Sequence, residues 1–157
     1  MSRQQRGFNS RWPRQNFMDL TFNLAKAIAD AASAHSEQVD KAGKAYILHP
    51  LRVMFMMDTE EEMIVAVLHD TVEDTDLTLK NVYTHYGSVV GDAVDALSRR
   101  DGESYTDYIY RVRENALARK VKLADLRDNT SPARIAALPA LEQKISQRYK
   151  QALEILT

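Results

Sequence analysis

The sequence predicts an all-α fold, and its hydrophobic pattern supports this in two ways. Apolar residues recur at intervals of three and four after residue 16, which is the spacing of one face of an α-helix. No segment shows the alternation of apolar and polar residues, rich in β-branched side chains, that is typical of a strand. The chain of 157 residues has no internal repeat or low-complexity linker, so we expect one bundle of about eight helices.

The first two helices are expected over residues 17–36 and 50–57. Pro50 can open the second one at its first position, because the N–H that proline lacks would be free there. Thr59 and Glu62 have the spacing of a capping box, which predicts a third helix over residues 60–74. Thr78, Gly87, Ser104, the Asp101-Gly102 turn and Pro132 then divide the later helices, expected over residues 78–87, 88–99, 104–115, 116–128 and 139–156.

Composition and charge narrow the classes of function. A net charge of −1 and an isoelectric point near 6.4 argue against a protein that coats DNA or an anionic membrane. The absence of cysteine excludes disulfides, thiolate metal sites and a cysteine nucleophile. No membrane-spanning stretch or signal-peptide core is seen, so we expect a cytoplasmic protein without a membrane partner, and leave a homodimer open.

Residues 1–18 differ in composition from the domain expected at 19–157. This N-terminal extension holds four arginines and has no acidic residue before Asp19. Three interpretations remain open: a disordered tail, an arm that packs on the body or on a second subunit, and a nucleic-acid-binding or targeting segment.

The most informative motif is a run of ionisable side chains at residues 69–76, directly after an apolar stretch. On a continuous helix His69 and Glu73 would lie four residues apart, as would Asp70 and Asp74, so all four could share one side. Converging carboxylates repel each other unless solvent or a cation lies between them. The run therefore predicts a divalent-metal site, and a solvated helix end is the alternative.

Two other segments carry the remaining candidate ligands. His49 stands at an expected helix start, and Asp125 follows an apolar turn with Asn129 four residues further along the same face. The alternatives are a capping or core histidine and a carboxylate paired with a nearby cation. With His69 and Asp70 these residues make a set of two imidazoles and two carboxylates, which suits Mn²⁺, Fe²⁺ or Zn²⁺.

The order of these motifs resembles the HD superfamily of metal-dependent phosphohydrolases and, more narrowly, the hydrolase domain of RelA/SpoT proteins. In length the chain is similar to the stand-alone small alarmone hydrolases. The resemblance covers about residues 20–156 and implies a compact HD-domain helical bundle. It is carried by the blocks Tyr46-Ile47-x-His49-Pro50, Leu68-His69-Asp70-Thr71-Val72-Glu73-Asp74-Thr75, Tyr86-Gly87, and Val121-Lys122-Leu123-Ala124-Asp125 with Asn129.

The resemblance also implies roles for the conspicuous residues. Glu73 and Asp74 match the acidic pair that positions and activates the attacking water. The spacing agrees with this, since a metal held by Asp70 lowers the pKa of its water and a carboxylate one turn away can accept the proton. The family removes the 3′-pyrophosphate from alarmone nucleotides such as (p)ppGpp. The implied metal ligands, usually for Mn²⁺, are His49, His69, Asp70 and Asp125.

Substrate recognition departs from the family pattern in one loop. The family has an Arg-Lys pair whose arginine stacks on the guanine base, whereas this chain has Asp40-Lys41, and Ala45 replaces a proline. An anion cannot provide cation stacking, so guanine, adenine, a relaxed preference and another 3′-phosphorylated nucleotide all remain open. Lys122 has a surface cation as its alternative. The residues expected to bind substrate are Lys41, Tyr46, Lys122, Asn129 and Tyr149.

Together these observations predict a Mn²⁺-dependent nucleotide 3′-pyrophosphohydrolase acting on (p)ppGpp or (p)ppApp. One alternative is an HD phosphatase acting on nucleoside monophosphates or NADPH. The other is a non-catalytic nucleotide-binding regulator. The ligand set with its acidic pair favours an enzyme, because a protein that only binds has no need of a water-activating carboxylate.

Overall fold

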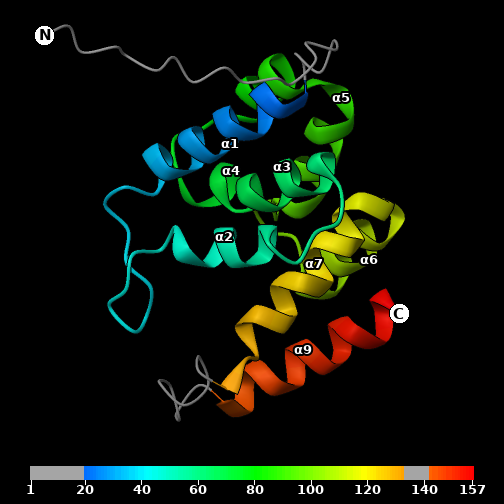
Figure 1. Ribbon diagram of the computed structural model, residues 1–157. Helices are drawn as coiled ribbons and strands as arrows, with labels where there is room; N and C mark the ends of the chain where they lie inside the picture. Colours follow the sequence, from blue (N-terminus) through cyan, green and yellow to red (C-terminus); the bar gives the residue numbers. More distant parts are fainter. Residues whose placement is uncertain (1–19, 133–141) are drawn as a thin grey trace, which may run out of the picture.

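The computed structural model describes residues 20–132 and 142–157, and within these ranges the chain is helical without a strand (Figure 1). An isolated antiparallel bridge joins Val39 and Ala45 in the loop before the second helix. The all-α prediction is confirmed. The helices are α1 (Leu20–Ala34), α2 (Leu48–Met54), α3 (Glu60–Leu68), α4 (Thr71–Asp74), α5 (Leu79–Leu97), α6 (Tyr105–Glu114), α7 (Ala116–Asn129) and α9 (Glu142–Leu156).

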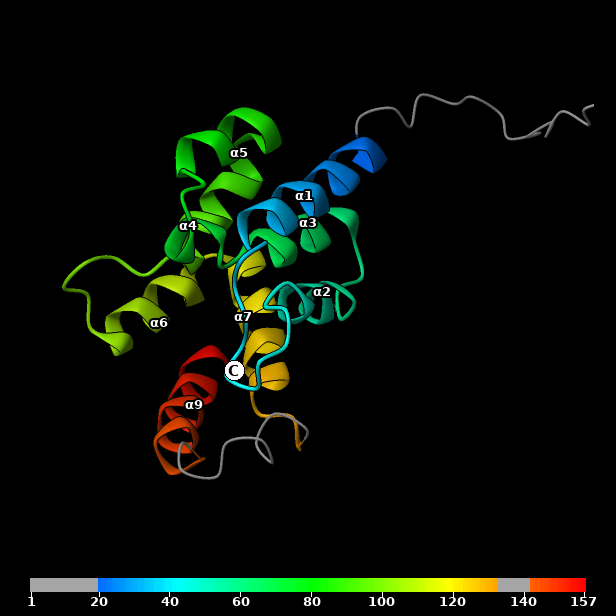
Figure 2. The ribbon, with the colours of Figure 1, turned by 90° about the vertical axis from the view of Figure 1, so that its left-hand side faces the viewer.

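Helix α3 lies at the centre of the domain. It contacts α1, α2, α5 and α7, and Figures 1 and 2 show these helices arranged around it. Every residue from Ile64 to Leu68 is buried, which explains why the sequence is apolar here on all sides of the helix. Helix α7 continues from this core toward α6 and α9, so it joins the two ends of the bundle.

The predicted caps and breaks are largely observed. Thr59 and Glu62 form the expected capping box at the start of α3, and Thr78 caps α5. Gly87 adopts φ 82° and kinks α5 at the predicted boundary between residues 78–87 and 88–99. The Ser104 side chain accepts from the Asp107 N–H and so caps α6.

Two predicted helix boundaries are wrong. Helix α2 begins at Leu48, so Pro50 is its third residue, where its missing N–H still belongs to the free donors of the first turn. The helix predicted over residues 60–74 is interrupted at residues 69–70, giving α3 and α4. The Thr71 hydroxyl donates to the Leu68 carbonyl at 2.7 Å and satisfies the last turn of α3.

Several predictions concern residues outside the described ranges. The arginine-rich extension at 1–18 and the starts of the helices predicted at 17–36 and 139–156 belong to this group. Within the described ranges, none of the helices combines the length and the apolar character that crossing a bilayer requires.

The buried position of α3 leads to a stability prediction. Replacing Ile64, which is 3% exposed, with alanine should lower the free energy of unfolding by about 2–5 kcal/mol, because a cavity opens in the core. The matched control is Val89→Ala on α5, where the side chain is 54% exposed and the change should stay within about 0.5 kcal/mol. Urea denaturation measures both, and equal losses would contradict the assigned burial.

Candidate metal centre and catalytic site

The four predicted metal ligands converge at one point between α2, α3 and α7. The Nε2 atom of His49 lies 3.1 Å from Asp125 Oδ1 and 3.7 Å from Asp70 Oδ2. The Nε2 atom of His69 lies 3.0 Å from Asp70 Oδ2 and 3.8 Å from Asp125 Oδ1. One ligand atom each of His49, His69 and Asp70 falls within 4.8 Å of the other two, a spacing that can hold a metal ion.

The break at residues 69–70 brings His69 and Asp70 to this point together. On a regular helix, adjacent side chains diverge by about 100° and do not face the same point. Asp70 instead adopts φ −100° and ψ −6° as the residue that precedes α4. The imidazole of His69 and the carboxylate of Asp70 can therefore both face His49 and Asp125.

His69 is oriented by the backbone. Its Nδ1 lies 2.7 Å from the Ala66 carbonyl oxygen, which only accepts, so Nδ1 carries the hydrogen and Nε2 faces the carboxylates. This Nε2 atom is buried and has no hydrogen-bond partner, although two carboxylates lie within 4 Å. An imidazole nitrogen together with carboxylate oxygens is a donor set that divalent ions prefer, so these residues fit a metal.

The charges of the cluster perturb one another strongly. Burial lowers the pKa of His69, but the Asp70 and Asp125 carboxylates outweigh burial and raise that pKa. Burial in turn raises the pKa of Asp70, and the neighbouring His69 outweighs it and lowers that pKa. The cluster therefore favours a positive charge between the imidazoles and carboxylates, which either a proton or a metal ion can supply.

Asp128 orients the second imidazole and was not assigned by sequence reasoning. Its Oδ2 accepts from His49 Nδ1 at 2.7 Å, which leaves His49 Nε2 facing the cluster. Arg52 donates to the same carboxylate through Nε at 2.7 Å and through Nη2 at 3.0 Å. The signal in the sequence was the position of Asp128 three residues after Asp125, on the same face of a helix.

Two residues that were predicted as substrate contacts donate to Asp125. The Lys122 ammonium donates to Asp125 Oδ2 at 2.8 Å, and the Asn129 amide donates to Oδ1 at 2.6 Å. Burial raises the pKa of Asp125, but Lys122 outweighs burial and holds that pKa well below its usual range. Lys122 and Asn129 therefore fix the orientation of a buried carboxylate, whether or not they also reach substrate.

Tyr46 plays the corresponding part for Asp70. Its hydroxyl donates to Asp70 Oδ2 at 2.6 Å. Burial, followed by the Asp70 charge, raises the pKa of Tyr46, so the phenol keeps its proton as a donor. The ring also lies edge-on to His49, with the two centroids 5.9 Å apart. Each of the four predicted ligands thus has a dedicated hydrogen-bond partner.

The predicted acidic pair belongs to the single turn of α4. Glu73 Oε2 accepts from the Arg99 N–H at 2.9 Å, and Glu73 lines a cavity of about 480 Å³ with Arg99 and Arg100. Partial burial of the Asp74 carboxyl, followed by the charges of Asp70 and Glu73, raises its pKa. A carboxyl with a raised pKa is a better proton acceptor than an ordinary aspartate.

Asp40, the residue that departs from the family pattern, has a structural role in its own turn. Its Oδ1 accepts from the Ala42 N–H at 2.9 Å and from the Lys44 N–H at 3.0 Å, and so closes the turn around Gly43. Gly43 has φ 75°, a conformation that favours glycine. Lys41 is exposed in the same turn, whereas Tyr149 on α9 packs partly buried against the core.

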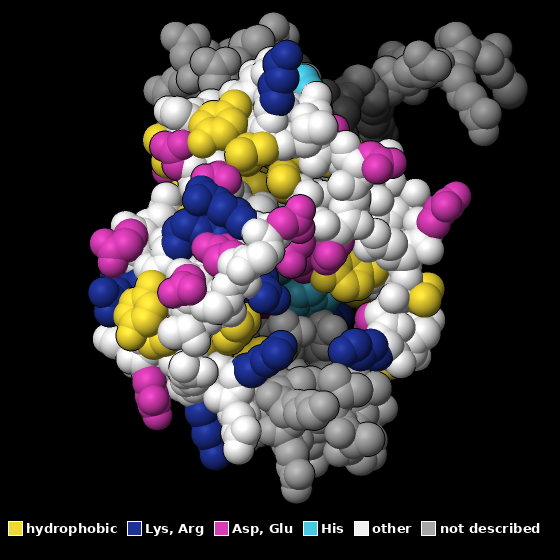
Figure 3. All heavy atoms as spheres, turned by 180° about the vertical axis from the view of Figure 1, so that it is seen from behind, with side chains coloured by type: hydrophobic (Ala, Val, Ile, Leu, Met, Phe, Trp, Pro, Cys, Tyr) yellow, Lys and Arg dark blue, Asp and Glu magenta, His cyan; other side chains and the backbone are white. Residues whose placement is uncertain are grey.

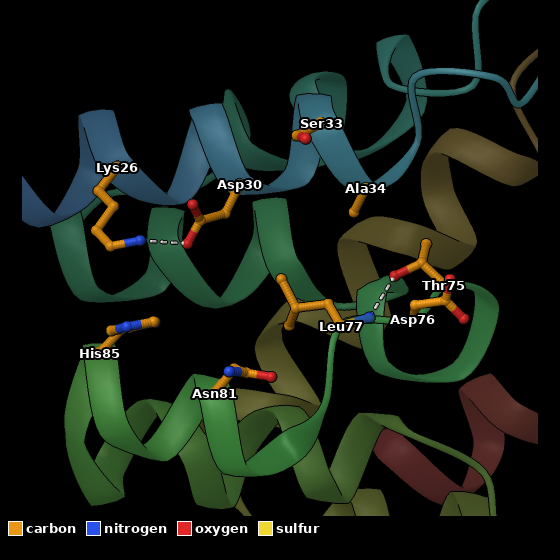
Figure 4. A pocket seen from close by; sticks show the side chains of 9 residues that line it. All are labelled: Lys26, Asp30, Ser33, Ala34, Thr75, Asp76, Leu77, Asn81 and His85. Carbon is orange, nitrogen blue, oxygen red and sulfur yellow. Dashed lines mark hydrogen bonds and ion pairs between the residues drawn. The ribbon is translucent and has the colours of Figure 1, made fainter.

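Figure 3 shows a recess on one face of the molecule with a histidine inside it, acidic side chains on one side and lysine or arginine side chains on the other. Such a border suits a phosphorylated ligand that meets a metal at one end and cations elsewhere. A second cavity of about 440 Å³ lies beside α1 and α5 (Figure 4), and none of the four predicted ligands lines it.

Lys26 and Asp30, two of the charged side chains that line this second cavity, are paired with each other. Lys26 and Asp30 form an ion pair at 2.7 Å, and the Tyr86 hydroxyl donates to the same aspartate at 2.6 Å. The Thr75 hydroxyl accepts from the Leu77 N–H. The cluster of His49, His69, Asp70 and Asp125 is therefore the candidate functional site.

The sequence is similar to those of several proteins named as ppGpp hydrolases. A guanosine-3′,5′-bis(diphosphate) 3′-pyrophosphohydrolase of Aquifex aeolicus is 29% identical over 144 residues, covering 84% of this chain and 20% of the relative. The protein of the same description from Vibrio cholerae is 34% identical over 67% of this chain and 15% of its own length. The bifunctional (p)ppGpp synthase/hydrolase SpoT of Escherichia coli is 30% identical over 70% of this chain and 16% of its own length.

The fold gives a second comparison. A solved structure of a metazoan ortholog of SpoT, which hydrolyzes ppGpp and plays a role in starvation responses, superposes with a TM-score of 0.68. The two chains share 22% sequence identity, and the superposition covers 85% of each. No family model matches the sequence.

The described helices form an all-α bundle consistent with an HD domain. In sequence and fold, the chain is related to the hydrolase domains of RelA/SpoT proteins. It spans only 15–20% of the length of the three curated relatives described above.

Divalent ions should stabilise the folded domain. At a free ion concentration 100 times the dissociation constant, binding to the native state adds about 2.7 kcal/mol to the free energy of unfolding. Thermal melts with Mn²⁺, Zn²⁺ or EDTA should show this as a raised Tm. Asp70→Ala should abolish the shift, and the exposed Asp76→Ala in the same acidic run should keep it. An equal shift in both variants would contradict the assigned ligand.

Asp128 should control metal affinity without contacting the metal. Asp128→Asn weakens the link from Arg52 to His49, and we expect about 10–100-fold weaker metal binding by isothermal titration calorimetry. Asp101→Asn, in the exposed loop before α6, is the matched control and should leave affinity unchanged. An unaltered dissociation constant in Asp128→Asn would remove the assigned orienting role.

Proposed function

We propose that the domain hydrolyses ppGpp to GDP and pyrophosphate in a Mn²⁺-dependent reaction. The observation that carries the proposal is the convergence of His49, His69, Asp70 and Asp125, in a chain related to named ppGpp 3′-pyrophosphohydrolases. In this reaction a water oxygen attacks the phosphorus attached to the ribose 3′ oxygen. The bond between this phosphorus and the 3′ oxygen breaks, pyrophosphate leaves, and the 3′ oxygen takes a proton.

The proposed chemistry divides between the cluster and helix α4. A divalent ion held by the four ligands would lower the pKa of water and neutralise charge on the phosphoryl oxygens. Asp74 is proposed to accept the proton of the attacking water, because burial and its acidic neighbours raise its pKa. Glu73, held through the Arg99 N–H, is proposed to orient that water.

Substrate selection is proposed to rest on groups around the recess. Lys41 and the arginines that line the cavity beside Glu73 are proposed to meet phosphates, and Tyr46, Lys122, Asn129 and Tyr149 are proposed to border the nucleotide. Asp40 is an anion whose carboxylate accepts from N–H groups of its own turn. We therefore expect no cation to stack on the base at this position. We therefore propose a relaxed base preference that includes ppApp. A nucleotide substrate also favours the cytoplasm as the site of action.

The test is a metal-dependent substrate panel. Purified protein with Mn²⁺ should release pyrophosphate from ppGpp and from ppApp. NADPH and nucleoside monophosphates are included in the panel to detect the activity of a different phosphatase. Release of phosphate from those two compounds alone would favour the alternative HD phosphatase. Binding of ppGpp without any product would favour the non-catalytic regulator.

Two variants separate the proposed roles. Asp70→Ala should lose both metal and turnover. Glu73→Gln should keep metal affinity but lower kcat by about 10²–10⁴-fold, because its amide does not reproduce a carboxylate toward water. Metal content by mass spectrometry and initial rates measure both effects. Loss of metal from Glu73→Gln would contradict its assignment to the water.

A further inference from the structure

A hydrogen-bond chain connects the end of α1 to helix α4. The Nδ1 atom of His35 lies 2.8 Å from the side-chain oxygen of Gln38. The side-chain amide of Gln38 then donates to the backbone carbonyl of Asp74 at 2.8 Å. His35 is only 1% exposed and matches none of the predicted ligand positions, so its burial needs another explanation.

The direction of this chain is fixed by chemistry. A backbone carbonyl only accepts, so Gln38 must turn its NH₂ group toward Asp74 and its oxygen toward His35. That oxygen also only accepts, so His35 must carry hydrogen on Nδ1. Each group has one role, and the reversed amide would set two acceptors against each other at the Asp74 carbonyl.

Helix α4 needs support from outside because it is very short. It has four residues, and one turn of helix is not stable by itself. The Asp74 carbonyl belongs to the last turn, where no following N–H within the helix is available to it. Two tertiary bonds hold this turn: Gln38 binds the Asp74 carbonyl, and the Arg99 N–H binds the Glu73 side chain.

The same two residues also hold Tyr46. The Gln38 carbonyl accepts from the Tyr46 N–H at 2.9 Å, and the ring centroids of His35 and Tyr46 lie 4.9 Å apart. Tyr46 in turn donates to Asp70 at 2.6 Å. The acidic turn and the tyrosine that orients a predicted ligand are therefore fixed by one local unit.

We propose that His35 and Gln38 are positioning residues that hold the single turn of α4, and with it the Asp74 carboxyl, in place beside the predicted metal ligands. The proposal rests on the proposed function only for its effect on turnover. Its effect on the order of α4 is independent of any activity.

The test uses one pair of variants at each position. Gln38→Glu keeps the acceptor for His35 but sets a carboxylate against the Asp74 carbonyl. His35→Leu removes the donor from the buried site, whereas His35→Asn keeps an N–H near the position of Nδ1. Glu37→Gln, an exposed change next to Gln38, is the matched control.

The first readout is amide hydrogen exchange in residues 71–75. Gln38→Glu and His35→Leu should speed exchange there by about 10-fold or more, because α4 opens more often. His35→Asn and Glu37→Gln should leave it near the native rate. Unchanged exchange in Gln38→Glu, with folding verified by circular dichroism, would overturn the proposal even if the protein were inactive on every nucleotide.

The second readout is kinetic. Gln38→Glu should lower kcat for ppGpp by about 10–100-fold while KM and the Mn²⁺ dissociation constant change less than about 2-fold, since only the acidic turn moves. His35→Asn should recover most of the turnover lost in His35→Leu. An active native protein whose kcat survives Gln38→Glu would refute the positioning role and leave the proposed function standing. A native protein without turnover would refute the function first, and exchange would then decide the positioning role.

Discussion

The approach of two imidazole nitrogens and two carboxylates to one buried point is the constraint on which the rest of the structure depends. Buried charges are costly unless each has a partner. In this domain each group has its own partner, and the partners belong to α2, α3, α7 and the loop before α2. They are the Ala66 carbonyl for His69, Asp128 with Arg52 for His49, Tyr46 for Asp70, and Lys122 with Asn129 for Asp125.

This arrangement explains the construction of the core. Helix α3 is buried on all sides and ends at the cluster, so the position of His69 follows from rigid packing. Helix α7 supplies Asp125 and Asp128 on neighbouring turns of one face, and contacts α2 and α3. The groups that need the closest geometry thus stand on or next to the best-packed elements.

The acidic pair is held in a different way. Glu73 and Asp74 belong to a single turn whose position comes from hydrogen bonds to a loop on each side. Local order in such a turn is lost more easily than in α3, because few buried apolar contacts protect it. The site therefore combines a rigid cluster with an acidic turn whose position depends on Gln38 and Arg99.

The sequence predicted most of the local structure. Capping boxes and glycine breaks depend on residues close together in the chain, so Thr59, Thr78 and Gly87 marked real boundaries. It also named residues 49, 69, 70 and 125 as one set, from their chemistry and from the order of the motifs. It could not foresee the break at residues 69–70, because helical periodicity continues through that point and a local hydrogen bond ends it.

What only the tertiary structure decided are the partners of the charged groups. Tyr46 donates to Asp70 and Asp128 accepts from His49 across the fold, and neither Asp128 nor Gln38 had a role assigned from the sequence. Spacing along a helix shows which residues share a face but not what stands opposite them. The sequence by itself therefore determined the helices and the donor chemistry. The packing of the helices decided the pairs Tyr46–Asp70 and His49–Asp128, because these partners are 24 and 79 residues apart in the chain.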